Sequence, residues 1–208
     1  MIVWPPGFDT ALDRALFASV ETQIQPPSGA VLPYLPDGRM RYVLAANGLF
    51  VQARTAAIAV SARLAPLPPG LPYGQAREGV HLRHGPVPDA LWDELRRRAV
   101  AACPQEWSGY VRVEGGRYRL IEPTVHSRSA GHISATPLAE SYRDALVMHV
   151  HSHGAGEAYF SAQDDAADQT GGDGVYVAVV LGRCVDPTPV TMTQRRVVWR
   201  GLLPLRLL

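Results

Sequence analysis

The chain has 208 residues, of which 47% are hydrophobic and 19% are charged. These values fit a soluble globular protein of one domain, with or without a smaller appendage. The formal net charge of +1 gives no overall attraction toward nucleic acid. No apolar run approaches the roughly 20 residues that span a bilayer, and the N-terminus lacks the charged and apolar regions of a secretion signal. We therefore expect a cytoplasmic protein with no nucleic-acid partner and no membrane partner.

Two residue counts are unusual. Cysteine occurs only as Cys103 and Cys184, and neither lies in a C-x-x-C pair, so we expect two reduced core thiols rather than a disulfide. Lysine is absent, and all 20 basic residues are arginine. A general compositional bias explains this absence. The alternative is protection of the chain from tagging, because lysine is the usual site of isopeptide modification.

Residues 1–85 are expected to form a small β-containing accessory region. Residues 10–20 fit one short helix. Two strands, 42–44 and 49–51, flank Asn47-Gly48, a dipeptide that is typical of tight hairpin turns. Residues 57–60 predict a third strand.

The Pro-rich residues 65–72 predict an extended linker rather than a packed element. We place the domain boundary between this stretch and Pro88, with the main domain over residues 86–208. Its first helix is expected to be capped by Asp89, to bury one face at i+4 spacing and to end at Pro104. The run of arginines at 96–98 is interpreted as a solvated helix surface without a binding role.

Strands and helices then alternate along the rest of the chain. We predict a hairpin of 110–113 and 118–121 around 114–116, strands at 132–134, 146–150, 175–181 and 195–199, and helices at 138–142 and 161–169. This order favours an α/β or α+β fold, with one mixed sheet flanked by helices.

One segment indicates chemistry. His151 and His153 follow a strand, and residues two apart in a strand point to one face, so their imidazoles can lie side by side. Asp164 follows eleven residues later, just inside a predicted helix. Three protein ligands leave a fourth position open for water, which is the catalytic rather than the structural zinc pattern.

Hydrolysis at such a site needs two further groups, a general base and a donor to the oxyanion. Glu106 is the best candidate for the base, because it follows the first helix and enters the strand at residue 110. Glu157, in the loop between the ligands, is a weaker candidate. Ser161 precedes Asp164 by three residues, so one helical turn places its hydroxyl on the metal side.

These residues resemble the JAMM (JAB/MPN-type) zinc metallopeptidases, whose pattern is a glutamate ahead of a strand followed by H-[S/T]-H-x7-S-x2-D. The resemblance covers roughly residues 88–185. It implies a JAB/MPN-like mixed sheet flanked by helices, with the layering of cytidine deaminases. It also implies one zinc ion per chain. His151, His153 and Asp164 would be the zinc ligands, Glu106 the general base and Ser161 the oxyanion donor.

Several neighbours of these residues need separate interpretation. His149 shares the strand face of His151, and we expect it to support the site or to pack rather than to bind metal. Asp165 and Asp168 are expected to be solvated, with Asp165 as a weak substitute ligand. Gly154 replaces the proline of many family members, which concerns loop rigidity rather than ligation.

The segments H-V-H-S-H and F-S-A-x-D-D, after a non-catalytic N-terminal region, resemble the PRTRC system protein A family. Members are encoded in bacterial mobile-element operons beside a ThiF-type activating enzyme and small ubiquitin-like proteins. The resemblance implies that the chain processes or deconjugates a ubiquitin-like protein, and that the ThiF-type enzyme is a second partner.

Other classes fit less well. A metallo-β-lactamase-type site needs H-x-H-x-D-H, whereas position 155 is alanine, and the P-C-x-x-C of a nucleotide deaminase is absent. The alternative that remains is a non-catalytic MPN-type scaffold in the same system. We favour catalysis because every ligand and the base are present.

Overall fold

The computed structural model describes residues 20–27, 30–129, 132–136, 145–170, 175–185, 192–199 and 205–206. Its contacts divide the chain into two compact units. The first consists of Met1–Arg54 and Ala59–Val80, and the second of Thr55–Ile58 and His81–Leu208. The helix predicted over 138–142 lies outside the described residues, as does all but the last residue of the helix predicted over 10–20.

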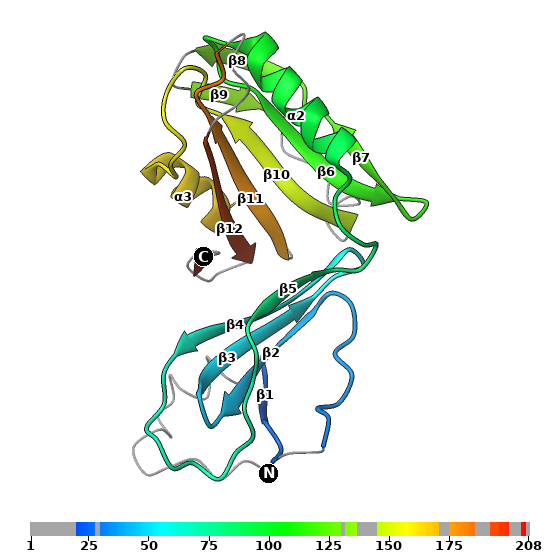
Figure 1. Ribbon diagram of the computed structural model, residues 1–208, viewed down its shortest axis with the longest axis vertical. Coiled ribbons are helices and arrows are strands. Elements are labelled where there is room, and N and C mark those ends of the chain that lie inside the picture. Colours follow the sequence, from blue (N-terminus) through cyan, green and yellow to red (C-terminus); the bar gives the residue numbers. More distant parts are fainter. Residues whose placement is uncertain are drawn as a thin grey trace. The chain divides into compact units, whose positions relative to one another are not determined.

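The first unit is built on a sheet that has five strands in the described residues, in the order β1-β2-β3-β4-β5 (Figure 1). The strands are β1 (Glu21–Ile24), β2 (Arg39–Ala45), β3 (Gly48–Arg54), β4 (Ile58–Ala65) and β5 (Gly79–Leu82). β1 is parallel to β2, whereas β2, β3 and β4 pair antiparallel. The three strands predicted here are confirmed. β1 and β5 were not predicted.

The predicted hairpin is present, but its turn lies one residue earlier than the Asn-Gly pattern indicates. Ala45 pairs with Gly48, so Ala46 and Asn47 form the turn. Gly48 begins β3 with φ +154°, and a Cβ there would lie 2.7 Å from the carbonyl oxygen of Ala65. Glycine is therefore needed for the close approach of β4 rather than for the turn itself.

The prediction of a Pro-rich linker is wrong. Residues 66–78 connect β4 with β5, which are neighbours in one sheet, so the Pro-rich stretch is a loop within the first unit. Proline prevents this loop from adding to the sheet ladder, but it does not separate two domains. The last crossing from the first unit to the second lies between Val80 and His81, within the range predicted between the Pro-rich stretch and Pro88, and Thr55–Ile58 also belongs to the second unit.

The second unit contains a mixed sheet that has six strands in the described part of the chain, in the order β13-β12-β11-β10-β6-β7. They are β6 (Ser108–Glu114), β7 (Arg117–Ile121), β10 (Leu146–Ser152), β11 (Val175–Gly182), β12 (Met192–Trp199) and β13 (Leu205–Arg206). β10 and β11 are parallel, and the other pairs are antiparallel. Gly115 and Gly116, with φ of +55° and +75°, form the tight turn of the predicted β6–β7 hairpin.

A second, two-stranded sheet of β8 (Val125–Ser129) and β9 (His132–Ala135) stands beside this one, so the described strands of the unit form two sheets rather than the single sheet expected. β9 was predicted, whereas the all-exposed β8 gives no periodic pattern. The predicted α+β class, with a mixed sheet and flanking helices, is confirmed.

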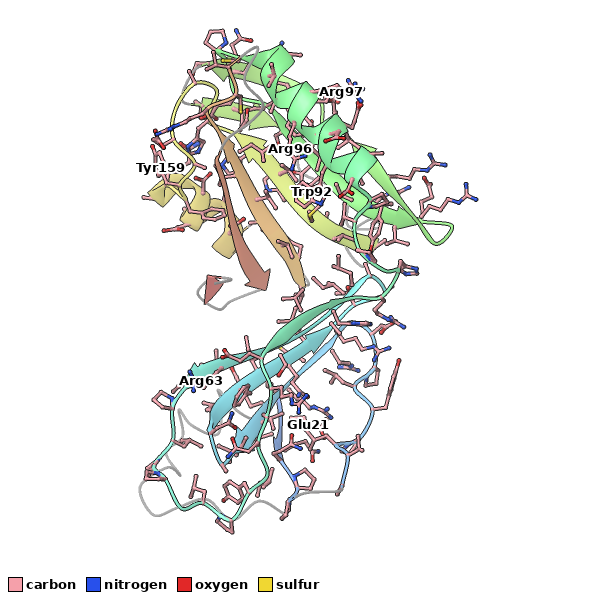
Figure 2. The ribbon with its side chains drawn as sticks, in the orientation of Figure 1. Glu21, Arg63, Trp92, Arg96, Arg97 and Tyr159 are labelled. Carbon is pink, nitrogen blue, oxygen red and sulfur yellow. The ribbon has the colours of Figure 1, made fainter. Side chains whose placement is uncertain are left out.

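Helix α2 (Asp89–Ala102) contacts β10 through a face that buries Leu95 and Ala99. Its N-cap is Pro88, and Asp89 is already helical, so the prediction that Asp89 caps the helix is wrong. The carboxylate still lies in the first turn, where the helix dipole favours negative charge. The arginines of α2 form ion pairs with acidic side chains, as in Arg96–Asp93 at 3.0 Å, and Figure 2 shows Arg96 and Arg97 on this helix.

Helix α3 (Ala162–Thr170) contacts β12. β10 and β11 lie in the centre of the sheet, and every residue of β11 is buried, which explains their almost continuous apolar sequences. The carboxyl end of β10 leads into the loop before α3 (Figure 1). No helix in the described residues is long and apolar enough to span a membrane.

Candidate metal centre

The end of β10 brings two imidazoles together. His151 pairs with Ser108 of β6 on one side and with Val180 of β11 on the other, so its backbone is fixed from both neighbours. His153 lies just beyond the strand, and its N–H donates to the carbonyl of Leu181 at 2.9 Å. The ring centroids of the two histidines are 5.2 Å apart.

Asp164 completes the cluster from the first turn of α3. Its Oδ1 lies 3.1 Å from Nε2 of His151, and its Oδ2 lies 3.8 Å from Nε2 of His153. One ligand atom from each of the three residues lies within 4.8 Å of the other two. The structure thus brings together the three residues that the spacing of the motif predicts as ligands.

Ser161 is the N-cap of α3 and holds the Asp164 carboxylate. The Ser161 hydroxyl donates to Oδ2 of Asp164 at 2.7 Å, and the Ser161 N–H donates to the same oxygen at 2.7 Å. In return, the Asp164 N–H donates to the Ser161 hydroxyl at 3.1 Å. This reciprocal arrangement is a capping box, and it fixes both the start of the helix and the direction of the carboxylate.

The Asp164 carboxylate is stabilised in its charged form. Burial by itself would raise its pKa, but the close contact with His151, the charge of that imidazole and the two hydrogen bonds from Ser161 together hold the pKa well below its usual range. Asp164 therefore offers a full negative charge between the two imidazoles.

The His153 ring is oriented by a hydrogen bond on the side away from Asp164. Its Nδ1 lies 3.1 Å from the backbone carbonyl of Glu157, which can only accept a hydrogen bond, so Nδ1 carries the hydrogen and Nε2 keeps a free lone pair on the side of the cluster. Burial, and after it the charge of His151, lowers the pKa of His153, which favours this neutral form. The ring centroids of Tyr159 and His153 are 4.7 Å apart in an edge-on arrangement, and Figure 2 labels Tyr159 in the loop between β10 and α3.

The loop after His153 is held by the end of β11. The N–H groups of Arg183 and Cys184 donate to the carbonyls of Gly156 and Gly154, at 2.7 and 2.8 Å. Gly154 has φ +55°, and a Cβ there would lie 2.5 Å from the carbonyl oxygen of Pro104. Proline, whose φ is fixed near −65°, cannot adopt this conformation, so glycine at this position is required by the backbone.

Gly154→Ala is expected to lower the free energy of unfolding by about 1–3 kcal/mol, because it forces an L side chain into the left-handed region against a neighbouring backbone. Urea denaturation of the intact chain measures the loss. Gly79→Ala is the control, since a Cβ at Gly79 meets no atom within 4 Å, and its effect should stay within about 0.5 kcal/mol. Equal stability of Gly154→Ala and the unchanged chain would contradict the explanation.

Glu106 is brought to the same end of the sheet. The next residue, Trp107, exchanges hydrogen bonds with Ser152: its N–H donates to the Ser152 hydroxyl at 3.0 Å, and its carbonyl accepts from the Ser152 N–H at 2.8 Å. Glu106 is only 8% exposed. Burial raises its pKa, and the charges of His151 and Asp164 act on it in opposite directions. A buried carboxyl that interacts electrostatically with two of the candidate ligands is suited to proton transfer.

His149 lies outside the cluster. Its Nε2 is 3.1 Å from the Ser108 hydroxyl, and its ring stacks on Tyr110 with centroids 4.7 Å apart. Burial, together with the charge of the neighbouring His151, lowers its pKa to about 3, so the ring is neutral. The centroids of His149 and His151 are 6.0 Å apart, which makes His149 a packed neighbour of a candidate ligand.

The remaining acidic neighbours differ in part from expectation. The Glu157 carboxylate is exposed and pairs with Arg183, so its side chain is engaged away from the cluster. Asp165 is not in the cluster that the described residues form. The prediction that Asp168 is solvated is wrong: it is 6% exposed and accepts a hydrogen bond of 2.7 Å from the Tyr176 hydroxyl. Helical spacing alone did not show that Tyr176 of β11 reaches this residue of α3.

The cysteines are free in the structure, as expected. Cys184 is buried, and burial, with a smaller contribution from Cys103, raises the pKa of its thiol to about 11. A thiol with that pKa is protonated near neutral pH and is a poor nucleophile. Cys103 is only partly buried and follows the last residue of α2.

The three clustered side chains fit a zinc ion. Nε2 of His151 is buried and, among the described residues, makes no hydrogen bond of acceptable geometry, although Oδ1 of Asp164 lies 3.1 Å away. Burial of an unpaired ring nitrogen costs free energy, unless the nitrogen donates a hydrogen bond or its lone pair binds a metal ion. Two imidazoles and one carboxylate are a common donor set for catalytic zinc.

Comparison with protein families agrees with this geometry. Residues 88–198 match the family described as prokaryotic homologs of the JAB domain, and the match covers just over half of the chain. The chain therefore belongs to the prokaryotic JAB family. Residues 10–83 match a second family, described as a domain of unknown function, DUF2016. No curated protein matches the chain.

Proposed function

We propose that the protein is a zinc-dependent metallopeptidase that hydrolyses a peptide or isopeptide bond. The observation that carries the proposal is the convergence of His151, His153 and Asp164 beside a buried Glu106 in a chain of the JAB family. One zinc ion per chain would be held by the first three residues. When bound, zinc lowers the pKa of water and polarises a carbonyl group.

Glu106 supplies the proton transfer. In its ionised form the carboxylate accepts a proton from the attacking water, and in its protonated form it returns that proton to the leaving nitrogen. Its raised pKa makes the carboxylate a stronger base, which favours the first of these two transfers, the acceptance of a proton from water. The Trp107–Ser152 hydrogen bonds keep Glu106 beside the end of β10.

Ser161 has two roles, to orient the Asp164 carboxylate and to donate to the oxyanion. Its hydroxyl hydrogen is directed at Asp164, so it orients that carboxylate. A serine hydroxyl rotates readily, and rotation toward a developing oxyanion would supply the donor that amide hydrolysis needs. The N-cap contact from the Ser161 N–H to Asp164 would remain during this rotation.

Ser161→Ala is expected to lower kcat by about 10²–10³ while zinc stays bound, because an oxyanion donor is lost and no ligand is removed. The measurement is the hydrolysis rate at saturating zinc, with metal content determined in parallel. Ser161→Thr, which keeps a hydroxyl at the N-cap, is the matched control and should retain most of the activity. A kcat of Ser161→Ala equal to that of the unchanged chain would leave Ser161 with the capping role alone.

For the substrate we propose a ubiquitin-like protein or its conjugates, with a ThiF-type activating enzyme as a second partner. The support is the resemblance of the motif region to the PRTRC system protein A family. The absence of lysine suits this setting, since a chain without lysine offers a tagging system only its α-amino group. Lysine counts in the neighbouring proteins of the operon test this point, because equal depletion in all of them would leave compositional bias as the sufficient explanation.

The experiment is a cleavage assay on the purified full chain. The substrate is the ubiquitin-like protein of the same operon, extended at its C-terminus by a short peptide whose release is followed by mass spectrometry. We expect cleavage with zinc, loss of cleavage with a chelator and recovery when zinc is added back. Zinc binding without cleavage of this fusion or of a lysine-linked conjugate would instead support the non-catalytic scaffold.

A further inference from the structure

The first unit contains a cavity of about 500 Å³ that the proposed hydrolysis does not use. One wall is the segment that follows β1, with Gln25, Pro26 and Pro27, and the other is residues 73–77 of the loop before β5. Its volume lies within the range of about 300–1,000 Å³ that is typical of ligand sites. Its described lining residues all belong to the first unit.

The two walls are fixed to each other and to the sheet. The Gly74 N–H donates to the Gln25 carbonyl at 3.0 Å, and the Gly74 carbonyl accepts from the Ala46 N–H at 2.9 Å. A Cβ at Gly74 would lie 1.9 Å from the carbonyl oxygen of Pro26, so only glycine permits this approach. The cavity is therefore built into the fold rather than formed by a loose surface loop.

Asn47 holds the second wall from the sheet side. Its side chain donates to the Ala76 carbonyl at 2.8 Å and accepts from the Ala76 N–H at 3.0 Å. Ala76 is buried in the core of the unit, whereas Gln75 and Arg77 on either side of it line the cavity. The anchoring of Ala76 thus turns its two neighbours toward the cavity.

The cavity combines three kinds of chemical group. Tyr73, Pro26 and Pro27 supply apolar surface, and Gln25 and Gln75 supply amides that can both donate and accept. Arg77 supplies a guanidinium that, in the described part of the chain, makes no hydrogen bond and no ion pair. Its neighbour Glu78 instead accepts from the backbone N–H of Arg63 at 3.0 Å.

A single free guanidinium selects an anion, and its fork of N–H groups matches a carboxylate. Phosphate carries more charge and is usually held by several cations or by a concave row of backbone N–H groups. Among the lining residues that the structure describes, Arg77 is the one cation, and Pro26 and Pro27 have no N–H. Paired glutamine amides beside the guanidinium match the alternating N–H and C=O groups of a peptide.

We propose that this cavity binds the C-terminal carboxylate of an extended peptide. Arg77 pairs with the carboxylate, Gln25 and Gln75 bond the last peptide groups, and Tyr73 packs against the side chain next to them. The ligand is the free tail of another protein, and the site belongs to the part of the chain that matches a domain of unknown function. The proposal is independent of the metal centre.

The test is titration of the intact, isotope-labelled chain with acetyl-Gly-Ala-Leu-Ala, followed by amide NMR shifts. We expect the shifts to concentrate at residues 25–27 and 73–77. The same peptide with a C-terminal amide should bind at least about tenfold more weakly, because the charge-assisted pair is lost. Equal binding of the acid and the amide, shifts elsewhere in the chain or no shifts at millimolar peptide would overturn the proposal.

Two arginine variants complete the test. Arg77→Gln should weaken binding of the peptide acid at least about tenfold, while its spectrum stays that of a folded chain because the side chain is exposed. Arg39→Gln, at the far end of β2, also removes an exposed guanidinium from the same sheet and should leave binding unchanged. Equal losses in both variants, or tighter binding of inorganic phosphate than of the peptide acid, would contradict a carboxylate site.

Discussion

Glu106→Gln is expected to abolish hydrolysis while leaving zinc bound. The substitution removes a proton acceptor, keeps the size of the side chain and takes away no ligand, so the loss should reach about 10²–10⁴ in kcat. Glu106 is buried beside Trp107, whose backbone bonds to Ser152 do not depend on the carboxylate. The fold and the metal content should therefore stay unchanged. The measurement is kcat for the ubiquitin-like fusion, with zinc content determined on the same sample.

Glu157→Gln is the matched control for this experiment. Glu157 is the other glutamate that the sequence offers as a base, but its carboxylate is exposed and paired with Arg183. Its replacement should leave kcat within a factor of a few. Zinc loss in Glu106→Gln, or activity equal to that of the unchanged chain, would remove Glu106 from the role of base, and inactivity of Glu157→Gln alone would transfer that role.

The pH dependence of kcat/KM is a second test of Glu106. A general base must be ionised before it can accept a proton, and burial raises the pKa of Glu106. The acid limb of kcat/KM should therefore lie at a higher pH than an exposed glutamate would give. A shifted acid limb that persisted in Glu106→Gln with residual activity would have to come from another group.

Asp164→Asn is expected to remove the metal rather than the base. The amide keeps an oxygen near Ser161 but loses the charge that the two imidazoles face. Loss of a hydrogen bond that only supports a ligand lowers metal affinity by roughly 10–100-fold. Loss of the ligand's charge should lower the zinc affinity by more than this. The measurement is zinc stoichiometry after dialysis. Asp165→Asn, one residue further along α3 and outside the cluster, should retain one zinc per chain. Retention of zinc by Asp164→Asn would contradict its assignment as a ligand.

The candidate centre was predictable from sequence because its residues lie on short segments of regular structure. Alternation along residues 146–150 predicts a buried strand, and the two-residue spacing of His151 and His153 brings both to its end. The three-residue spacing of Ser161 and Asp164 predicts that one helical turn brings their side chains to the same side. Local periodicity was sufficient for this part of the site.

Features that depend on contacts between distant segments were not predictable in the same way. Asp168 looked solvated because nothing along α3 indicates that Tyr176 reaches it from β11. The replacement of proline by Gly154 was interpreted as a matter of loop rigidity, because the crowding at Gly154 comes from Pro104, 50 residues earlier in the chain. The Pro-rich stretch looked like a linker because composition predicts irregular backbone, but not that β4 and β5 on either side pair in one sheet.

The most direct test of the central claim is diffraction from crystals of the full chain grown with zinc, measured on both sides of the zinc absorption edge. We expect one anomalous peak per chain, at about 2.0–2.2 Å from Nε2 of His151, Nε2 of His153 and a carboxylate oxygen of Asp164, with a water in the fourth position. An ordered cluster without a peak, or a peak held by other residues, would contradict the assignment of this site as a catalytic zinc centre.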